Sequence, residues 1–523
     1  MPKAEGFLRS FAHVKKNKNY EVIIVKKTFK ILFLLLILAM VFIMVSCKAP
    51  ANSNADSPTS DKPADPNETT AESPAEAVVQ FPYDDAQIDL KGAAFKILIG
   101  QEWASDTLNI EDYDIETLNG EVLNDAIYNR NLIIMDKYNL KFEPIHANDK
   151  IKSFMSKTIQ SGIDEYDLVT PLLNHAGDFA SKGYGINIYN TALSIDAPWW
   201  DQNILKSTSI GGAAYYTAGD IFIKHYDGLP MLMFNKRLLN ELGLDSPYKY
   251  VGENQWTLDK FNEMVKGRYI DLDENGKRNK YDQYGLATQC DYVISIVNGC
   301  GQFFTDKDKD DLPVFVGNSE KMANILDRVM QHYGSDDTYC IHRDASKEGG
   351  WNGPVPSAAW IFPEGRSLFY WGMARYLGLY LREMEDEFGI VPIPKYDSSQ
   401  DRYYSTVNGW NSYTVMLPRT VQDVERNSII LDAMAYHGMK MIKPAYYEVC
   451  LQRKYTRDEE SAAMLDIIFS SAHYEAGGGG SFAGGLCDAI QKGSVNTASL
   501  YEKNAGKIEK DIQTIIDAYE NAK

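Results

Sequence analysis

Short apolar runs and helical repeats alternate through the first part of the chain. The run Ala94–Gly100 is apolar except for Lys96 and ends on glycine, as a short buried strand does. Apolar positions within 121–138 recur at roughly helical spacing and predict an amphipathic helix. Further strands are predicted at 139–143 and 166–170, with a helix at 150–160. This alternation predicts βαβ units and a largely parallel sheet.

The same patterns continue toward the C-terminus. Strands are predicted at 232–234, 389–392 and 412–417. Helices are predicted at 235–242, at 257–266 and through most of the chain beyond 425, and Thr257 is the predicted N-cap of the second of them. The glycine-rich stretch 477–485 follows an apparent helix and lacks the lysine of a phosphate-binding loop. We therefore expect a flexible surface loop there.

The N-terminus has the order of charges and apolar residues typical of an export signal. Residues 1–30 carry eight Lys/Arg against two Glu, and residues 31–45 form an unbroken apolar run. Fifteen residues are short for a bilayer-spanning helix, which needs roughly 20. The run ends in Met44-Val45-Ser46-Cys47, which resembles a bacterial lipobox, although Met44 stands where Leu is usual.

The lipobox resemblance implies cleavage after residue 46 and lipidation of Cys47. The alternative is a plain transmembrane anchor with an incidental cysteine, and both interpretations place the remainder outside the cytoplasm. Residues 47–90 then form a disordered tether, because proline and small polar residues dominate and cannot bury enough surface to offset the ordering entropy.

Composition narrows the possible partners. The chain has 523 residues, of which 44% are apolar, so a large core can form in two or three domains. Without residues 1–46 the formal charge becomes 45 − 70 = −25, which disfavours nucleic acid and anionic lipid surfaces. Besides Cys47 there are five cysteines and no C-x-x-C pattern, so neither a disulfide framework nor a zinc site is predicted.

Several segments together resemble one protein family. In chain order they are Tyr166-Asp167-Leu168-Val169, Met233–Leu239, Gln255–Phe261, Glu364–Phe369 ahead of Trp371-Gly372, and Phe388–Pro394. Each motif is weak alone, but their shared order behind a lipobox resembles the extracellular solute-binding lipoproteins of ABC importers, of the maltose-binding, family 1 type. The resemblance spans about residues 93–523.

The resemblance implies an α/β, two-lobed type 2 periplasmic-binding-protein fold with a hinge and an interlobe cleft. The expected N-terminal lobe comprises 91–231 plus about 405–450, and the C-terminal lobe 232–404 plus about 451–523. The chain is expected to cross between lobes near 231–235 and 403–412. The implied partners are a small solute and the membrane permease, and we expect a monomer with no catalytic activity and no cofactor.

Candidate ligand contacts follow from the positions of polar and aromatic residues near strand ends, where ligands bind in open parallel sheets. Asn174 and His175 follow the strand at 166–170 and could face the ligand or cap the next helix. Trp103 follows the first strand and could stack on a ligand or cover the edge of the lobe. Asp220 could accept two hydroxyl donors or hold a turn.

Three further candidates come from the later segments. Trp371 lies where relatives carry a cleft aromatic. Asn408 and Trp410 lie at the second crossing, where Gly409 permits close approach. Trp410 could instead pack between the lobes.

One loop has the spacing of a calcium site. Asp271, Asp273, Asn275, Asn279 and Asp282 occupy positions 1, 3, 5, 9 and 12, with Gly276 at position 6. Position 12 is Asp rather than Glu, no helix is predicted to follow, and Lys277, Arg278 and Lys280 reduce the local negative charge. A solvated turn is the favoured interpretation, and any calcium would be structural.

The expected solute is a carbohydrate, possibly an oligosaccharide, because 33 Tyr and 8 Trp suit polar ligands with apolar faces. Two other functions fit the same features. A sensory lipoprotein that reports to a membrane receptor would share the fold. A secreted carbohydrate-active enzyme would need a pair of carboxylates, although no H-E-x-x-H or G-x-S-x-G motif is present.

Overall fold

The structure is a computed structural model, and it describes residues 80–100, 115, 117–148, 150–344, 358–447, 459–475, 477, 479–493 and 495–521. These residues belong to one compact unit. No helix among them is both long and apolar enough to cross a membrane. The predicted signal peptide, Cys47 and Trp103 lie outside the described residues, as does the tether up to residue 79.

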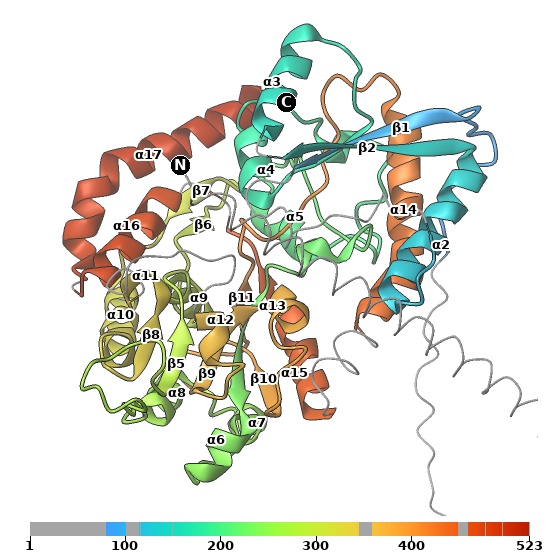
Figure 1. The fold of residues 1–523 in the computed structure, drawn as a ribbon. Coiled ribbons are helices and arrows are strands. Elements are labelled where there is room, and N and C mark those ends of the chain that lie inside the picture. The colour runs from blue at the N-terminus through green and yellow to red at the C-terminus, as the bar shows by residue number, and fades with distance from the viewer. Residues whose placement is uncertain are drawn as a thin grey trace, which may run out of the picture. The chain divides into compact units, whose positions relative to one another are not determined.

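The first sheet along the chain has three parallel strands in the order β2-β1-β3 (Figure 1). Its strands are β1 (Ala93–Gly100), β2 (Leu140–Asn148) and β3 (Leu168–Thr170). Phe95, Ile97, Leu98 and Ile99 are fully buried, so β1 is the central strand of this layer. The predicted βαβ pattern is confirmed.

Helices connect and cover the strands of this sheet. The long helix α2 packs against α14, which comes from far along the chain, and Figure 1 shows the two side by side. Residues 413–418 run beside β3, where Met416 bridges Val169 and Tyr413 bridges Leu172. The helices are α2 (Val122–Tyr138), α3 (Ile151–Ser161), α4 (Leu173–Ala180), η1 (Ile188–Asn190), α5 (Gln202–Thr208), η2 (Ile223–His225) and α14 (Val424–Pro444).

A mixed five-stranded sheet has the order β10-β4-β9-β5-β8. Strand β4 is antiparallel to both of its neighbours, whereas β5 is parallel to β8 and to β9. The carboxyl ends of β5, β8 and β9 therefore share one edge. The strands are β4 (Pro230–Asn235), β5 (Tyr284–Thr288), β8 (Thr338–Cys340), β9 (Ser367–Met373) and β10 (Phe388–Val391).

Helices and two small strand pairs surround the second sheet. The pairs are β6 (Thr305–Lys307) with β7 (Pro313–Phe315), and β11 (Ser405–Thr406) with β12 (Ala472–His473). The helices are α6 (Lys236–Glu241), α7 (Pro247–Gly252), α8 (Leu258–Val265), α9 (Tyr292–Gly299), α10 (Glu320–Tyr333), α11 (Ile341–Asp344), α12 (Ala358–Ile361), α13 (Ala374–Leu379), α15 (Glu459–Ser470), α16 (Gly480–Gln491) and α17 (Thr497–Asn521). Thr257 caps α8 as predicted, since its hydroxyl accepts from the Lys260 amide at 3.3 Å.

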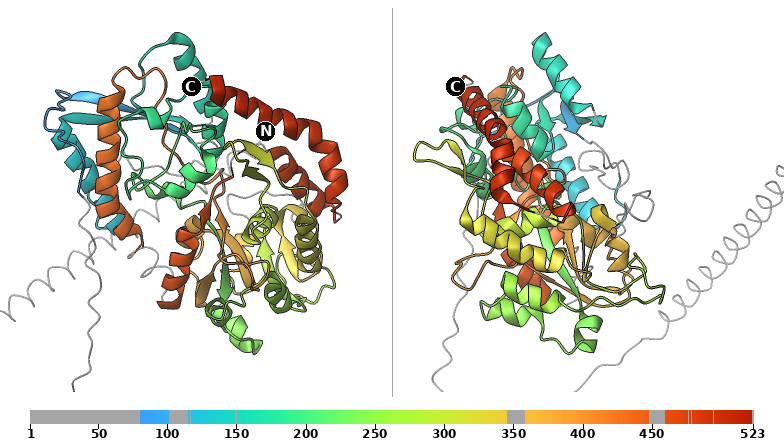
Figure 2. Two further views of the ribbon diagram at one scale, coloured as in Figure 1. Left: turned by 180° about the vertical axis from the view of Figure 1, so that it is seen from behind. Right: turned by 90° about the vertical axis from the view of Figure 1, so that its left-hand side faces the viewer.

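The C-terminal helix α17 contacts segments that are far apart in the sequence (Figure 2). Near its start, Tyr501 stacks on Phe315 of β7, with ring centroids 5.5 Å apart. Near its end, Tyr519 is buried and lies edge-on to Tyr215 at 4.8 Å. The helix therefore packs on β7 at one end and on the segment that follows α5 at the other.

The prediction of a flexible loop at 477–485 is wrong from Gly480 onward, where α16 begins. Packing overrides the poor helix propensity of glycine here, because Phe482, Leu486 and Ile490 are buried on one face. A Cβ at Gly485 would lie 2.9 Å from the Leu500 side chain. Glycine thus permits the close approach of α16 and α17.

Candidate functional site

The carboxyl end of β3 supplies two of the predicted contacts. The chain passes through Pro171 into α4, which carries Asn174 and His175 near its start. The His175 side chain is buried, and its ring lies edge-on to that of Trp410, with centroids 6.1 Å apart. Both residues therefore lie at the edge of the first sheet where open α/β folds bind ligands.

The carboxyl ends of β5 and β9 supply charged residues to the corresponding edge of the second sheet. Asp291 follows β5, and Arg375 is the second residue after β9. Arg375 is buried, and its guanidinium donates to the side-chain oxygen Oδ1 of Asn411 at 3.1 Å. Burial raises the pKa of neighbouring Tyr376 above its ordinary value, with a further contribution from Asp291, so its phenol stays protonated and can donate.

Residues 407–412, the crossing segment, contact both edges. The Asn408 amide nitrogen Nδ2 donates to Asp291 Oδ2 at 3.4 Å, beside the second sheet. On the other side, the Asn174 backbone amide donates to the Gly409 carbonyl oxygen at 3.2 Å. A Cβ at Gly409 would lie 2.2 Å from Asn174 Oδ1, so a side chain at position 409 would displace that of Asn174.

The crossing segment also presents a ring to solvent. Trp410 is 47% exposed, and its backbone amide donates to Asn408 Oδ1 at 2.9 Å. An exposed indole beside amide, carboxylate and guanidinium groups can bind a polar ligand that has an apolar face. The structure thus brings together Asn174, His175, Asn408 and Trp410.

Asp291 and Arg375 were not identified from the sequence. The signal that could have found them is their position directly after strands, the same argument that selected Asn174. The apolar pattern does not identify these strands, because neither β5, Tyr284–Thr288, nor β9, Ser367–Met373, alternates between apolar and polar residues.

Two predicted contacts lie apart from this set. Trp371 is in the interior of β9, is 1% exposed and packs edge-on against Tyr292. Asp220 is buried and forms an ion pair with Lys443 at 3.2 Å. Burial raises the Asp220 pKa to about 6, and the Lys443 charge opposes that rise. As ligand contacts both residues remain predictions, but neither side chain is open to a solute in this conformation.

A hollow of about 440 Å³ lies between the end of α14 and α15. Its lining is rich in rings and includes one cation and one carboxylate: Tyr226, Lys443, Pro444, Tyr446, Tyr447, Asp466, Phe469 and Ser470. Tyr446 donates to Asp227 at 3.4 Å, and the Asp227 carbonyl accepts from the Arg375 amide at 3.4 Å. Asp227 therefore contacts both Tyr446 in the lining of the hollow and Arg375 at the edge of the second sheet.

The predicted calcium loop folds around its own oxygens. One oxygen each from Asp271, Asp273 and Asp282 lie within 4.8 Å of one another. Asp271 Oδ2 accepts from the Gly276 amide at 2.8 Å, while its buried Oδ1 has no hydrogen-bond partner. Gly276 has a φ of 70°, which glycine adopts without strain. A buried carboxylate oxygen without a donor could accept a cation, whereas the other loop oxygens accept from amides of the loop, as in a solvated turn.

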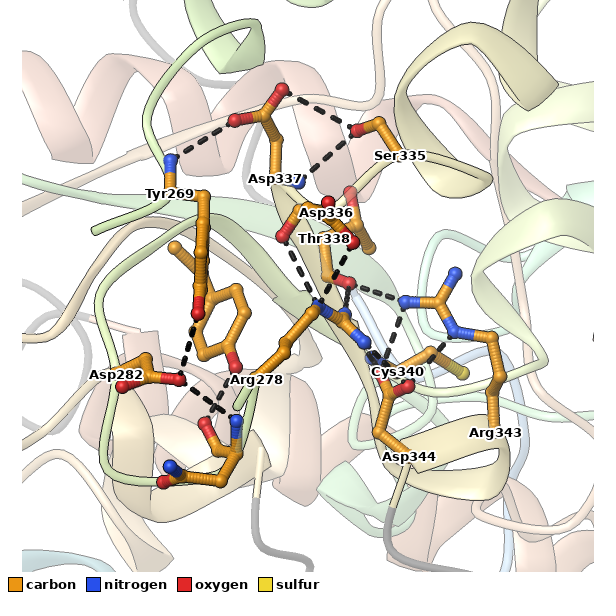
Figure 3. A network of polar contacts seen from close by, with 12 residues as sticks. Tyr269, Arg278, Asp282, Ser335, Asp336, Asp337, Thr338, Cys340, Arg343 and Asp344 are labelled. Carbon is orange, nitrogen blue, oxygen red and sulfur yellow. Dashed lines mark hydrogen bonds and ion pairs between the residues drawn. The ribbon is translucent and has the colours of Figure 1, made fainter. Parts of the chain in front are cut away.

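One of the positive charges that would oppose calcium binding, that of Arg278, is directed away from the loop. The Arg278 guanidinium donates to both Asp344 oxygens, at 2.7 and 2.9 Å, so its charge is directed at Asp344 (Figure 3). Asp282 is fully buried and accepts from the Tyr269 hydroxyl at 3.2 Å and the Asn279 amide at 2.8 Å. The chain then enters β5 and not a helix, as predicted, so the loop is not part of a helix–loop–helix unit.

No protein-family model and no curated protein matches the chain. Solved structures do. An ABC substrate-binding protein from Listeria monocytogenes in complex with cycloalternan matches with a TM-score of 0.52 at 9% identity, over 81% of this chain and 99% of that one. A cyclic α-maltosyl-1,6-maltose binding protein from Arthrobacter globiformis matches at 0.52 and 13%, over 82% and 99%. A cyclo/maltodextrin-binding protein complexed with maltotetraose matches at 0.50 and 13%, over 83% and 98%.

The chain therefore has the two-lobed α/β fold of the sugar-binding proteins of ABC transporters. The match covers nearly the whole of each similar structure. At this low identity the likeness concerns the fold, and function must be argued from the site.

Proposed function

We propose that this chain is the extracytoplasmic substrate-binding component of an ABC importer and captures a carbohydrate between its two lobes. The observation that carries the proposal is the crossing segment, which contacts the carboxyl edges of both sheets through Asn408 and Gly409. A solute bound there would touch both lobes at once. Such a site favours a closed state, because a ligand shifts an equilibrium only by binding one state better.

The residues at these edges suit a saccharide. The exposed indole of Trp410 offers a stacking face. Asp291 can accept from two hydroxyls, and Arg375 and Asn174 can donate to ring or hydroxyl oxygens. The three similar proteins are described with cycloalternan, cyclic α-maltosyl-1,6-maltose and maltotetraose, which supports a saccharide and extends to an oligosaccharide.

A thermal-shift screen of the full chain against mono- and oligosaccharides tests carbohydrate capture. A saccharide that binds only the folded state should raise the melting temperature, with about 2.7 kcal/mol of stabilisation at a concentration 100 times its Kd. Calorimetric titration of the best candidate then gives the affinity. If no saccharide shifts melting while peptides or other small solutes do, the carbohydrate assignment is wrong. Release of shorter sugars during the titration would point to an enzyme instead.

Import and sensing share this fold and are separated in cells. Deleting the gene from its host should abolish uptake of the radiolabelled saccharide identified in the screen, because the permease would receive no loaded binding protein. Normal uptake combined with a lost transcriptional response to the same saccharide would favour the sensory role.

We also propose that Cys47 carries a lipid that anchors the exported chain. Replacing Cys47 with Ser should release the protein from membranes or leave the precursor uncleaved, since a 15-residue apolar run is too short for a firm span. The measurement is labelling with a radioactive fatty acid. Equal labelling of the serine variant would contradict lipidation at this residue.

The loop 271–282 is proposed to bind a structural calcium ion that stabilises the approach to β5. Its supports are the clustered oxygens of Asp271, Asp273 and Asp282 and the unpartnered Asp271 Oδ1.

A further inference from the structure

Two thiols and a carboxylate meet at the carboxyl end of β5. Cys290 and Asp291 follow that strand, and Cys487 comes from α16, 197 residues further along the chain. One ligand atom from each of the three residues lies within 4.8 Å of the other two. The Cys290 thiol donates to Asp291 Oδ1 at 3.4 Å, and the Cys487 thiol donates to the Cys290 carbonyl oxygen at 3.7 Å.

An imidazole borders the same cluster. His342 follows β8, the parallel neighbour of β5, and its Nδ1 accepts from the Cys290 backbone amide at 3.3 Å. This contact holds the backbone of Cys290 in place, so His342 supports the cluster and is not one of its grouped ligand atoms.

The distance of 3.4 Å between the Cys290 sulfur and Asp291 Oδ1 is that of two ligands on one tetrahedral ion, and the Cys487 sulfur lies within 4.8 Å of both atoms. Ligands at about 2.0–2.3 Å from zinc lie roughly 3.3–3.8 Å from one another. Thiolate ligands select zinc and similar cations over calcium or magnesium. The other free cysteines of the described residues do not lie in such a group of ligands. Cys300 is buried in the core, and the Cys340 Sγ is hydrogen-bonded to the Tyr333 hydroxyl at 2.9 Å.

We propose that Cys290, Cys487 and Asp291 bind a thiophilic divalent cation, Zn²⁺ above all, with the fourth position open to water. The site would fasten α16 to the edge of the second sheet. It would also fix the carboxylate whose other oxygen, Oδ2, accepts from Asn408. The site goes beyond the proposed capture of a carbohydrate and does not depend on it.

Cobalt binding by the full chain, purified in detergent under argon with its thiols reduced, tests the site. One Co²⁺ per chain should bind, with thiolate-to-cobalt charge-transfer absorption and the intense visible bands of tetrahedral cobalt, and Zn²⁺ should displace it. Cys290→Ala and Cys487→Ala should each lose the charge-transfer band. Cys300→Ala is the matched control, because it removes a free thiol outside the cluster and should bind like the wild type.

Asp291→Asn keeps the tests valid if an alanine variant does not fold. This near-isosteric change should weaken cobalt binding about tenfold or more and leave the thiolate absorption in place. The proposal is overturned if the wild type shows no thiolate–cobalt band, or if Cys290→Ala and Cys487→Ala keep it. It is equally overturned if protein from the native host contains a Cys290–Cys487 disulfide and no bound metal.

Discussion

Replacing Trp410 with Ala gives the sharpest test of the proposed saccharide site. The ring is 47% exposed, and a tryptophan side chain offers about 250 Å² of burial, so roughly 120 Å² is free to contact a solute. At about 25 cal/mol per Å², covering all of it would contribute about 3 kcal/mol. A stacked sugar covers one face of the ring, so about half of that, roughly 1.5 kcal/mol, is the expected loss. Affinity should therefore fall about tenfold.

The chain provides a matched control for this substitution. Trp360 in α12 is 48% exposed and belongs neither to the crossing segment nor to the residues proposed to bind the saccharide. Calorimetric titration with the saccharide identified by thermal shift should show a tenfold loss for Trp410→Ala and unchanged affinity for Trp360→Ala. Equal affinities in the two variants would refute stacking on the crossing segment. Substitutions of Tyr447 and Phe469 would then test the hollow beside α15.

Three further predictions test other features of the fold. Burial raises the Asp220 pKa from 3.8 to about 6, so the unfolded chain releases this proton at a lower pH than the folded chain. The stability of the wild type relative to Asp220→Asn should therefore fall as pH rises from about 4 to about 6. Melting temperatures that change in parallel with pH in the two proteins would contradict the burial argument. Chelation should lower the melting temperature of the wild type and of the loop control Glu274→Gln, but leave Asp271→Asn unchanged, with calcium added back to confirm the effect. Gly438→Ala places a Cβ 1.8 Å from the Asp220 backbone oxygen, so the free energy of unfolding measured in urea should fall by about 3 kcal/mol or more. In the control Gly506→Ala the new Cβ meets nothing within 4 Å, so the free energy of unfolding should rise by about 0.5–1 kcal/mol.

Periodicity predicted strand β1 and helix α2 to within a residue because both are long and clearly patterned. Strand β3 has only three residues, but it lies inside the predicted strand at 166–170. Strand β8 has only three residues and no alternation that could distinguish it from a loop. Glycine-rich α16 was predicted as a loop, because the packing of Phe482 that holds it is not visible in local propensity.

The candidate site was predictable only as far as its residues are close in sequence to an identified strand end or crossing. Asn174 and His175 follow β3, and Asn408 and Trp410 lie on one short segment. The contact between Asn174 and Gly409 joins two segments that are far apart in the sequence, and no rule on local spacing predicts it. The pairing of Cys290 with Cys487 is of the same kind, so the rule that sought C-x-x-C motifs could not detect it.

Asp291 connects the two proposed sites through its two carboxylate oxygens. Oδ1 accepts from the Cys290 thiol, whereas Oδ2 accepts from Asn408 on the crossing segment. A cation that takes Oδ1 withdraws charge from the carboxylate and fixes its orientation, so Oδ2 becomes a weaker but better placed acceptor for a sugar hydroxyl. Linkage requires that any factor by which the cation changes saccharide affinity also applies to the effect of the saccharide on cation affinity. Since the two ligands would share one side chain, this coupling needs no movement of the lobes.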